Sequence, residues 1–239
     1  MIEITKRMKL IANTVTKGNV VADIGCDHGY VSIYLIKQDI SPKVIAMDLR
    51  EGPLKKAKTN TRQSNDKKVI ENIEFRISNG FEKLKPKEVD TAIIAGMGGG
   101  LICKIIKDGE KVVRELKELI ISPQSEIADV RHFLHDNGYR IVSQWMIKDD
   151  GKFYTVIKVV NGKDIDYTEI EYKYGKQLID EKNQILREYL EWDKKRLEKV
   201  AASIENKDGE NVEARKKQLV DNLAEINDVL EVVAYGRNV

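Results

Sequence analysis

An acidic glycine turn near the start of the chain carries the residue types of a nucleotide-cofactor site. An apolar run over 20–24 ends in Gly25, and Asp27 and Gly29 follow before a helical pattern begins. Glycine lets the backbone approach a ligand closely, and the order of strand, turn and helix places backbone amides beside that ligand. Asp48 ends the next apolar run, where a carboxylate can accept hydrogen bonds from ribose hydroxyls. These residues predict a cradle for a nucleotide-like cofactor.

The charge of this turn indicates which cofactor it holds. A dinucleotide fingerprint has further glycines two and five residues after the first, whereas Asp27 and Tyr30 stand at those places here. A pyrophosphate would meet a carboxylate in this turn. S-adenosylmethionine (SAM) has no phosphate and carries a sulfonium, an ammonium and a ribose diol, which suit an acidic turn. We therefore predict a SAM site, and the alternative is a structural turn in which Asp27 binds nothing.

Polar residues follow the apolar run over 73–77 and indicate an adenine site. The side-chain amide of Asn79 could read the edge of an adenine, and Phe81 could cover its ring. Gly80 stands between them, and an ordinary Asn-Gly turn is the alternative interpretation.

A glycine-rich segment follows the apolar run over 91–95, at the place where methyl donor and acceptor would meet. Its sequence is Gly96-Met97-Gly98-Gly99-Gly100. The glycines let a flat base approach the backbone closely, and Met97 places one polarisable apolar side chain beside that base. Many amino-directed methyltransferases have an Asp or Asn with two prolines and an aromatic residue here, and those residues are absent from this segment. The alternative is a flexible loop before a helix.

Methyl transfer to an unprotonated ring nitrogen depends more on alignment than on acid–base help. Holding the nucleophile, the methyl carbon and the sulfur in line can supply up to about 7–11 kcal/mol of the barrier. Methylation of an adenine ring nitrogen yields a cation, which a carboxylate would stabilise and from which it could accept a proton. Asp27 is the candidate for this role. Tyr30 either contacts the target base or only packs, and His28 donates either to the cofactor carboxylate or to its own turn.

Composition excludes several classes of protein. The chain has 239 residues, enough for one sizeable domain and a smaller unit. No apolar run approaches the roughly 20 residues that span a membrane, and the start lacks the pattern of a secretion signal. Only Cys26 and Cys103 are present, so we expect no disulfide framework and a cytoplasmic location. His132 and His135 lie three residues apart without an evident third ligand, so no metal is expected.

Charge is divided unevenly along the chain. The formal net charge is +2, but the first 163 residues contain 28 basic and 21 acidic side chains, and the rest contain 13 and 18. A basic domain can attract a polyanion, although a lysine-rich surface can also serve solubility alone. Charge therefore permits a nucleic-acid partner without requiring one.

Apolar runs and helical patterns alternate through the first 160 residues. The Asp150-Gly151 pair is a hairpin turn signal, so the last two strands should be antiparallel. Ser125 can cap the helix after the fifth strand. This order predicts an α/β fold, the Rossmann-like seven-stranded sheet of class I SAM-dependent methyltransferases, whereas a nicotinamide-binding Rossmann domain ordinarily lacks the terminal hairpin. The expected strands are 19–24, 43–48, 73–77, 91–95, 119–122, 139–147 and 153–160.

The remaining chain has the pattern of two long helices. Apolar residues recur at alternating spacings of four and three residues over 179–204 and again over 219–233, which is the spacing of a heptad seam. Asn183 and Asp193 are polar residues at seam positions of the first helix. The segment 206–210 breaks the pattern and can turn the chain, which predicts an antiparallel helical hairpin. We expect a SAM-dependent methyltransferase domain over 1–162 and a helical coiled-coil domain over 163–239. Basic clusters at 194–196 and 215–217 could grip phosphate together or be solvated helix faces.

Three motifs resemble the TrmK family of bacterial tRNA adenine-22 N1-methyltransferases. They are 23–30 (DIGCDHGY), 96–99 (GMGG) and 148–154 (KDDGKFY), and the similarity runs through the whole chain. The resemblance implies SAM as methyl donor and an adenine in the D-arm region of tRNA as acceptor. Because N1 lies on the Watson–Crick edge, the base must be unpaired or extruded, at a cost of roughly a few kcal/mol. By motif matching, the implied cofactor-pocket residues are Asp23, Gly25, Asp27, His28, Asp48, Asn79, Gly80, Gly96 and Met97.

Two rival functions stay open. The protein could methylate another RNA or a small molecule, although the helical tail argues against a small molecule. It could also bind SAM or RNA without turnover while the helical hairpin recruits a partner. The pattern does not indicate an oligomeric state.

Overall fold

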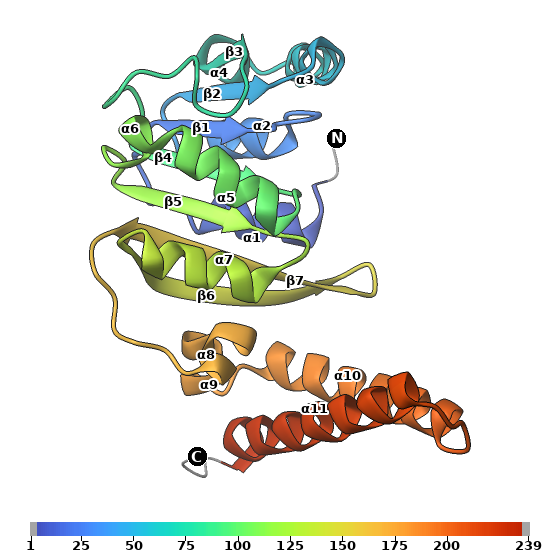
Figure 1. Cartoon of the computed structure of the whole chain (residues 1–239). Coiled ribbons are helices and arrows are strands. Elements are labelled where there is room, and N and C mark those ends of the chain that lie inside the picture. The colour runs from blue at the N-terminus through green and yellow to red at the C-terminus, as the bar shows by residue number, and fades with distance from the viewer. Residues whose placement is uncertain (1–3, 236–239) are drawn as a thin grey trace. The chain divides into compact units, whose positions relative to one another are not determined.

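The computed structural model describes residues 4–235 and contains two compact units, which divide between Ile165 and Asp166 (Figure 1). Within the described residues, no helix combines the length and the apolar character that crossing a bilayer requires.

The first unit is built on a seven-stranded sheet with the order β3-β2-β1-β4-β5-β7-β6 (Figure 1). Neighbouring strands among the first five are parallel, and β7 runs antiparallel to both β5 and β6. This confirms the predicted Rossmann-like sheet with an antiparallel terminal hairpin. The strands are β1 (Val21–Ile24), β2 (Val44–Asp48), β3 (Ile73–Ile77), β4 (Thr91–Ala95), β5 (Glu118–Ser122), β6 (Tyr139–Asp149) and β7 (Lys152–Asn161).

Helices cover both faces of this sheet, with α1 and α2 on one face and α5 and α7 on the other (Figure 1). Because both faces are covered, β1, β2, β4 and β5 are apolar almost without alternation, as parallel strands are when no face meets water. The helices of this unit are α1 (Lys6–Asn13), α2 (Tyr30–Lys37), α3 (Glu51–Gln63), α4 (Lys67–Asn72), α5 (Gly99–Asp108), α6 (Glu110–Val113) and α7 (Ile127–Asp136).

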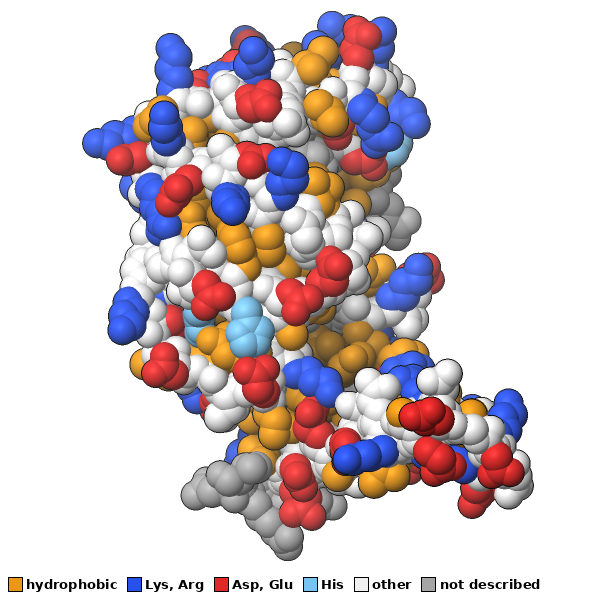
Figure 2. All heavy atoms as spheres, viewed as in Figure 1, with side chains coloured by type: hydrophobic (Ala, Val, Ile, Leu, Met, Phe, Trp, Pro, Cys, Tyr) orange, Lys and Arg blue, Asp and Glu red, His pale blue; other side chains and the backbone are white. Residues whose placement is uncertain are grey.

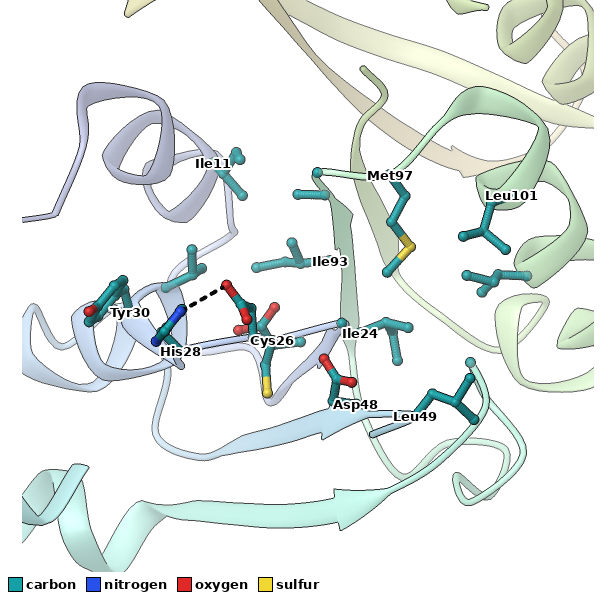
Figure 3. A pocket seen from close by; sticks show the side chains of 18 of the residues that line it. Ile11, Ile24, Cys26, His28, Tyr30, Asp48, Leu49, Ile93, Met97 and Leu101 are labelled. Carbon is teal, nitrogen blue, oxygen red and sulfur yellow. Dashed lines mark ion pairs between the residues drawn. The ribbon is translucent and has the colours of Figure 1, made fainter. Parts of the chain in front are cut away.

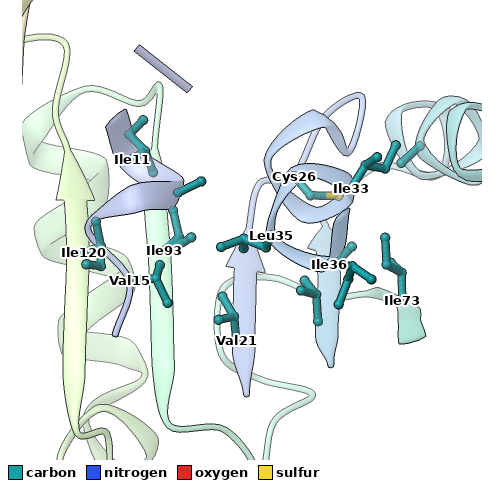
Figure 4. Packing of buried hydrophobic residues seen from close by; sticks show 14 of the residues in the cluster. Ile11, Val15, Val21, Cys26, Ile33, Leu35, Ile36, Ile73, Ile93 and Ile120 are labelled. Atoms are coloured by element: carbon teal, nitrogen blue, oxygen red, sulfur yellow. The ribbon is translucent and has the colours of Figure 1, made fainter. Parts of the chain in front are cut away.

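The core lies between the sheet and these helices. Ile11 of α1 packs with Ile93 of β4 and Ile120 of β5, while Leu35 of α2 lies over Val21 of β1 (Figure 4). All five side chains are at most 1% exposed. Burying one such side chain contributes about 1.5–3 kcal/mol. This packing fixes α1 and α2 against the strands whose carboxyl ends carry the predicted site.

Local turn geometry confirms one expectation and corrects another. Asp150 and Gly151 both have positive φ, 47° and 73°, as a two-residue hairpin turn requires, and they join β6 to β7 directly. The prediction that Ser125 caps the helix after β5 is wrong. The capping position belongs to Glu126, which has a φ of 55° and no side-chain capping bond.

The second unit is helical. Its helices are α8 (Glu169–Tyr174), α9 (Lys176–Asp180), α10 (Gln184–Ile204) and α11 (Glu210–Tyr235). The last two pack against each other, and residues 205–209 join them, one residue before the predicted break at 206–210. Their winding as a coiled coil stays a prediction.

One predicted seam residue of this unit has a different role. The Oδ1 atom of Asn183 accepts the backbone N–H of Ile185 at 3.0 Å and that of Leu186 at 3.1 Å. Asn183 is therefore the N-cap of α10 and does not belong to the seam. Asp193 is 8% exposed, as a seam position should be, and forms an ion pair with Arg196 at 2.6 Å.

The face of the first unit seen in Figure 2 carries charges of both signs. Lys and Arg side chains are prominent over the end of the sheet that carries β2 and β3, and acidic side chains lie among them (Figure 2). This distribution agrees with a moderate basic excess and shows no uniformly basic surface on that face.

Candidate functional site

A cavity of about 570 Å³ opens where β1, β2 and β4 end (Figure 3). Parallel strands in an open sheet present their carboxyl ends at one edge, and ligands of such folds bind there. Ten predicted site residues line this cavity: Asp23, Gly25, Asp27, His28, Tyr30, Asp48, Asn79, Gly80, Gly96 and Met97. The structure thus brings these residues together, and their individual roles stay predictions.

The turn after β1 fits closely against the loop after β4. Gly25 has a φ of 74°, and its backbone N–H donates to the carbonyl oxygen of Met47 at 2.8 Å. A Cβ atom added at Gly25 would lie 2.2 Å from the terminal methyl carbon of Met97. A residue with a side chain would therefore be strained in its backbone and would displace Met97. This glycine lets the two ligand-facing segments meet.

Asp27 and His28 form the exposed tip of that turn. The Asp27 side chain is 63% exposed, and one carboxylate oxygen lies 3.5 Å from the Nε2 atom of His28 (Figure 3). The His28 ring stacks on Tyr30 with the centroids 5.5 Å apart and the planes 8° from parallel. Asp27 also has a φ of 46°, an uncommon backbone conformation for a residue other than glycine. The carboxylate thus stands at the cavity with the imidazole as its neighbour.

Two further carboxylates line the inner part of the cavity. Asp23 is 5% exposed and accepts a hydrogen bond from the Ser32 hydroxyl at 2.6 Å. Burial raises the pKa of Asp23 to about 6, although the bond from Ser32 opposes this shift. Asp48 is 8% exposed, and its Oδ1 atom accepts the backbone N–H of Arg50 at 2.9 Å. A cationic ligand would lower the cost of keeping Asp23 ionised.

Burial and its acidic neighbours also keep the cysteine of the turn inert. Cys26 is 8% exposed, and desolvation together with the charges of Asp23 and Asp48 raises the pKa of its thiol. A thiol that stays protonated is a poor nucleophile.

The segment after β3 only partly follows the prediction. Asn79 lines the cavity, and its side-chain amide donates to a Glu82 carboxylate oxygen at 2.9 Å. The prediction that Phe81 covers a ligand ring is wrong. Phe81 is 3% exposed and is absent from the cavity lining. Its ring packs so closely against Gly109 that a Cβ atom added there would lie 2.3 Å from a ring carbon.

Leu49 and Leu101 provide the apolar rim that Phe81 does not. They are 64% and 50% exposed, line the cavity, and lie beside Asp48 and at the start of α5, respectively (Figure 3). Exposed leucines around a cavity are suited to covering a flat ring. Sequence reasoning missed both, although a leucine directly after the ribose-binding candidate Asp48 was an available signal.

Residues after β5 hold the glycine-rich loop. The backbone N–H of Gln124 donates to the carbonyl oxygen of Met97, and the Glu126 carboxylate accepts the backbone N–H of Gly100, both at 2.9 Å. A Cβ atom on Gly99 would lie 2.7 Å from the carbonyl oxygen of Ser125. The glycines therefore permit close packing between two loops, and these bonds restrain the position of Met97.

The opening helix also contributes to the site, which sequence reasoning missed. Arg7, Met8 and Ile11 of α1 line the cavity, as does Gln124 from the end of β5. No local motif marks these positions, because only packing of α1 against the sheet brings them to the strand ends.

The two histidines of α7 do not contribute to the cavity. His135 instead has its Nε2 atom 3.1 Å from Asp164, and residues 4–235 contain no cluster of three potential metal ligands.

Comparisons with known proteins agree with this geometry. A family model described as a methyltransferase domain matches residues 4–157. The tRNA (adenine(22)-N(1))-methyltransferase of Bacillus subtilis (strain 168) is 28% identical over 236 residues, covering 96% of this chain and 98% of that protein. The crystal structure of the B. subtilis m1A22 tRNA methyltransferase TrmK is 26% identical with a TM-score of 0.81, covering 96% and 100%.

A further similar structure contains the expected cofactor. Sp1610 of Streptococcus pneumoniae, solved in complex with S-adenosyl-L-methionine, is 28% identical with a TM-score of 0.84. The similarity covers 95% of this chain and 100% of that one. It therefore includes both units of the present chain.

Proposed function

Because this chain belongs to the TrmK family of tRNA adenine-22 N1-methyltransferases, we propose that it transfers the methyl group of SAM to N1 of adenine 22 in tRNA. The observation that carries this proposal is the cavity where β1, β2 and β4 end, which combines three carboxylates with a glycine-rich loop. Its lining suits a cofactor that is cationic and lacks phosphate. The turn after β1 disfavours a dinucleotide, because the Asp27 carboxylate would lie against its pyrophosphate.

The residues around the cavity fit SAM in chemistry and in space. Asp48 is suited to the ribose hydroxyls, and Leu49 beside it to the adenine ring. Asp23 is suited to the cationic amino acid end of SAM. Gly25, which has no side chain, lets the Met97 methyl group lie against the turn at the cavity wall. When bound, SAM supplies an electrophilic methyl group.

The protein's contribution to the reaction is mainly positioning. Met97 and the backbone around it offer one wall for the target base, and the bonds from Gln124 and Glu126 keep that wall in place. Preorganised alignment of this kind can supply several kcal/mol of a barrier, up to about 7–11. Tyr30, which stacks on His28, offers an aromatic face on which the extruded base can rest.

Asp27 is assigned the electrostatic role. Methylation at N1 leaves a positive charge on the adenine, and a carboxylate at the mouth of the cavity stabilises that charge and can accept a proton from the product. The exposed position of Asp27 suits a group that must meet an incoming base. Asp23, being buried, is better placed to act on the cofactor side.

The partner is a tRNA, and the helical second unit is proposed to hold the folded RNA. Its clusters at 194–196 and 215–217 are partly committed to other contacts. The Lys194 amine donates to Asn227 at 2.7 Å, and Lys216 pairs with Glu213 at 2.7 Å. Lys195 and Lys217 are exposed and remain available for phosphate. A tRNA-modifying enzyme of this kind is expected to work in the cytoplasm.

Transfer of labelled methyl groups to unmodified tRNA tests the proposal. We expect one N1-methyladenosine at position 22, identified by nuclease mapping and mass spectrometry. A tRNA carrying guanosine at position 22 is the matched control and should accept no label. Labelling of a different nucleotide or a different RNA would contradict the assigned target. SAM binding without transfer to any tRNA would instead favour a non-catalytic binding protein.

A further inference from the structure

Two arginines stack on tyrosines at opposite ends of the β6–β7 hairpin. The Arg114 guanidinium carbon lies 4.4 Å from the ring centroid of Tyr139, the first residue of β6. The Arg7 guanidinium carbon lies 4.6 Å from the ring centroid of Tyr154, which pairs with Ile147 near the hairpin turn. The two stacks are alike in geometry, so the roles of the two arginines are distinguished by their other contacts.

Arg114 is fully used within the protein. Its Nε and Nη2 atoms donate to the Glu110 carboxylate at 3.2 and 3.1 Å. The guanidinium also donates to the carbonyl oxygens of Asn137 at 2.7 Å and Gly138 at 3.4 Å. With its charge paired and its donors occupied, this arginine serves to join α6 to the start of β6.

Arg7 has the same aromatic platform but no such partners. No residue within 4–235 accepts a hydrogen bond from its guanidinium or forms an ion pair with it, although the group is partly buried and lines the cavity. The nearby carboxylate of Asp149 accepts the backbone N–H of Arg7 at 3.0 Å and so anchors the helix. A guanidinium has five N–H donors and keeps its charge, and desolvating a charge without a partner is unfavourable. Arg7 is therefore held ready for an oxyanion.

We propose that Arg7 binds a backbone phosphate of the RNA strand that presents the target adenine, and so positions that base over the glycine-rich loop. This inference rests on the function proposed above. The planar guanidinium matches phosphate in two parallel hydrogen bonds, and the Tyr154 ring fixes its plane. Arg7 acts as a positioning residue, since it grips the strand and not the reacting atoms.

The hairpin tip favours phosphate over the carboxylate of SAM as the oxyanion. Lys148 lies over Phe153, with its amine 5.2 Å from the ring centroid, and Lys152 is exposed at the start of β7. A strand with repeated phosphates can use several such cations, whereas one cofactor carboxylate engages only one. The turn also carries Asp149, whose carboxylate accepts the backbone N–H of Arg7, and Asp150. Lys148, Lys152 and Arg7 exceed these two acidic groups by one positive charge.

Substitution of Arg7, with Arg114 as the matched control, tests the proposal. For Arg7→Gln we expect the KM for tRNA to rise on the order of tenfold to a hundredfold, as for a lost charge-assisted hydrogen bond. The dependence of log(kcat/KM) on log[salt] should become shallower by about 0.7, the value for one phosphate contact in a single strand. SAM affinity by calorimetry should stay within about twofold. Arg114→Gln removes an equivalent stacked arginine and should leave the KM and the salt dependence unchanged.

Conservative variants separate positioning from folding. Arg7→Lys keeps the charge and loses the planar fork, so it should keep the salt dependence and lose part of the tRNA affinity. Tyr154→Leu removes the aromatic platform and should weaken tRNA binding. If Arg7→Gln does not fold, the other two variants still test the proposal. It would be overturned if Arg7→Lys and Tyr154→Leu had the same KM for tRNA and the same salt dependence as the unsubstituted protein.

Other outcomes are equally decisive. Loss of SAM affinity by Arg7→Gln, with an unchanged KM for tRNA and unchanged salt dependence, would assign Arg7 to the cofactor carboxylate and overturn the phosphate assignment. Failure of the function proposed above would look different, because the unsubstituted protein would then methylate no tRNA. In that case filter binding of tRNA to the Arg7 variants would still measure the phosphate contact.

Discussion

Asp23 lies on β1 and Asp27 lies in the turn that follows it. Both line the cavity, but their environments differ. Asp27 has a largely exposed side chain beside His28, and Asp23 is 5% exposed and held by Ser32. Different environments allow two carboxylates to perform two tasks at one site. We assign the exposed group to the developing charge on the base and the buried one to the cofactor, and each assignment has its own test.

Replacement of Asp27 by alanine should abolish turnover with little effect on folding. The side chain makes one contact at 3.5 Å with His28, so its removal leaves no buried partner unsatisfied. Single-turnover transfer to tRNA measures the chemical step, and thermal unfolding measures stability. Asp27→Asn is the isosteric control and should also be inactive, because it lacks the charge. Near-normal turnover by either variant would remove Asp27 from the catalytic assignment.

Asp23 should make stability depend on pH. Burial raises its folded pKa to about 6, above its value in the unfolded chain, so the folded state binds the extra proton and stability falls as pH rises between these values. Asp23→Asn cannot ionise and still accepts from Ser32. Its free energy of unfolding should match that of the unsubstituted protein near pH 4 and exceed it by up to about 3 kcal/mol near pH 7.

Urea unfolding of both proteins across this pH range measures the difference. SAM should reduce it, because a bound cation favours the ionised carboxylate. A constant difference between the two proteins at every pH would show that Asp23 does not titrate in this way.

At the scale of elements, the turn after β1 and the loop after β4 behave as one unit. Gly25→Ala places a Cβ atom 2.2 Å from the present position of the Met97 methyl group. Alanine also pays about 1–2 kcal/mol for the left-handed backbone. Since the Met97 side chain is flexible, it should move aside, so the variant should fold, bind SAM more weakly and transfer methyl groups slowly.

A double-mutant cycle with Met97→Ala isolates this contact. Removing the methionine side chain relieves the clash, so the two substitutions should couple by about 0.5–3 kcal/mol in SAM binding free energy, measured by calorimetry. Gly18→Ala is the control for backbone strain, since Gly18 has a φ of 92° with no atom within 4 Å of an added Cβ. Strictly additive effects at Gly25 and Met97 would contradict the close fit of the two segments.

Elements whose signal is local could be predicted from the sequence, and those that depend on tertiary packing could not. The hairpin turn at Asp150-Gly151 follows from backbone preference alone, and the strands follow from runs of apolar residues. Asn183 fits the heptad spacing and still caps α10, because capping depends on where the helix begins. Spacing by itself does not distinguish the two.

The site divides in the same way. The acidic turn, Asp48 and the glycine-rich loop stand directly after strands, so the order of elements already brings them to one edge. Arg7 and Gln124 reach the cavity only because α1 packs on the sheet and β5 neighbours β4. Phe81 follows a strand too, yet its side chain turns into the core beside Gly109. The number of residues between a strand end and a turn residue does not determine the direction in which that residue's side chain points.

At the scale of the whole molecule, the charge of the chain bears on how RNA is held. Residues 1–163 have seven more basic than acidic side chains, and the remainder has five more acidic than basic. Long-range attraction of tRNA therefore belongs to the first unit. The second unit can contribute only through local basic positions, of which Lys195 and Lys217 are exposed.

Charge reversal at these two positions tests whether the helical hairpin holds RNA. If each lysine contacts a phosphate, Lys195→Glu with Lys217→Glu should raise the KM for tRNA at least tenfold and make log(kcat/KM) less dependent on log[salt] by about 1.4. SAM affinity should not change, since neither residue lines the cavity. Lys182→Glu with Lys207→Glu reverses two exposed charges elsewhere in the same unit, outside both basic clusters, and controls for the general change in charge. Equal effects of this control and of Lys195→Glu with Lys217→Glu would mean that the hairpin repels RNA only through its overall charge, which would leave strand binding to Arg7 and the first unit.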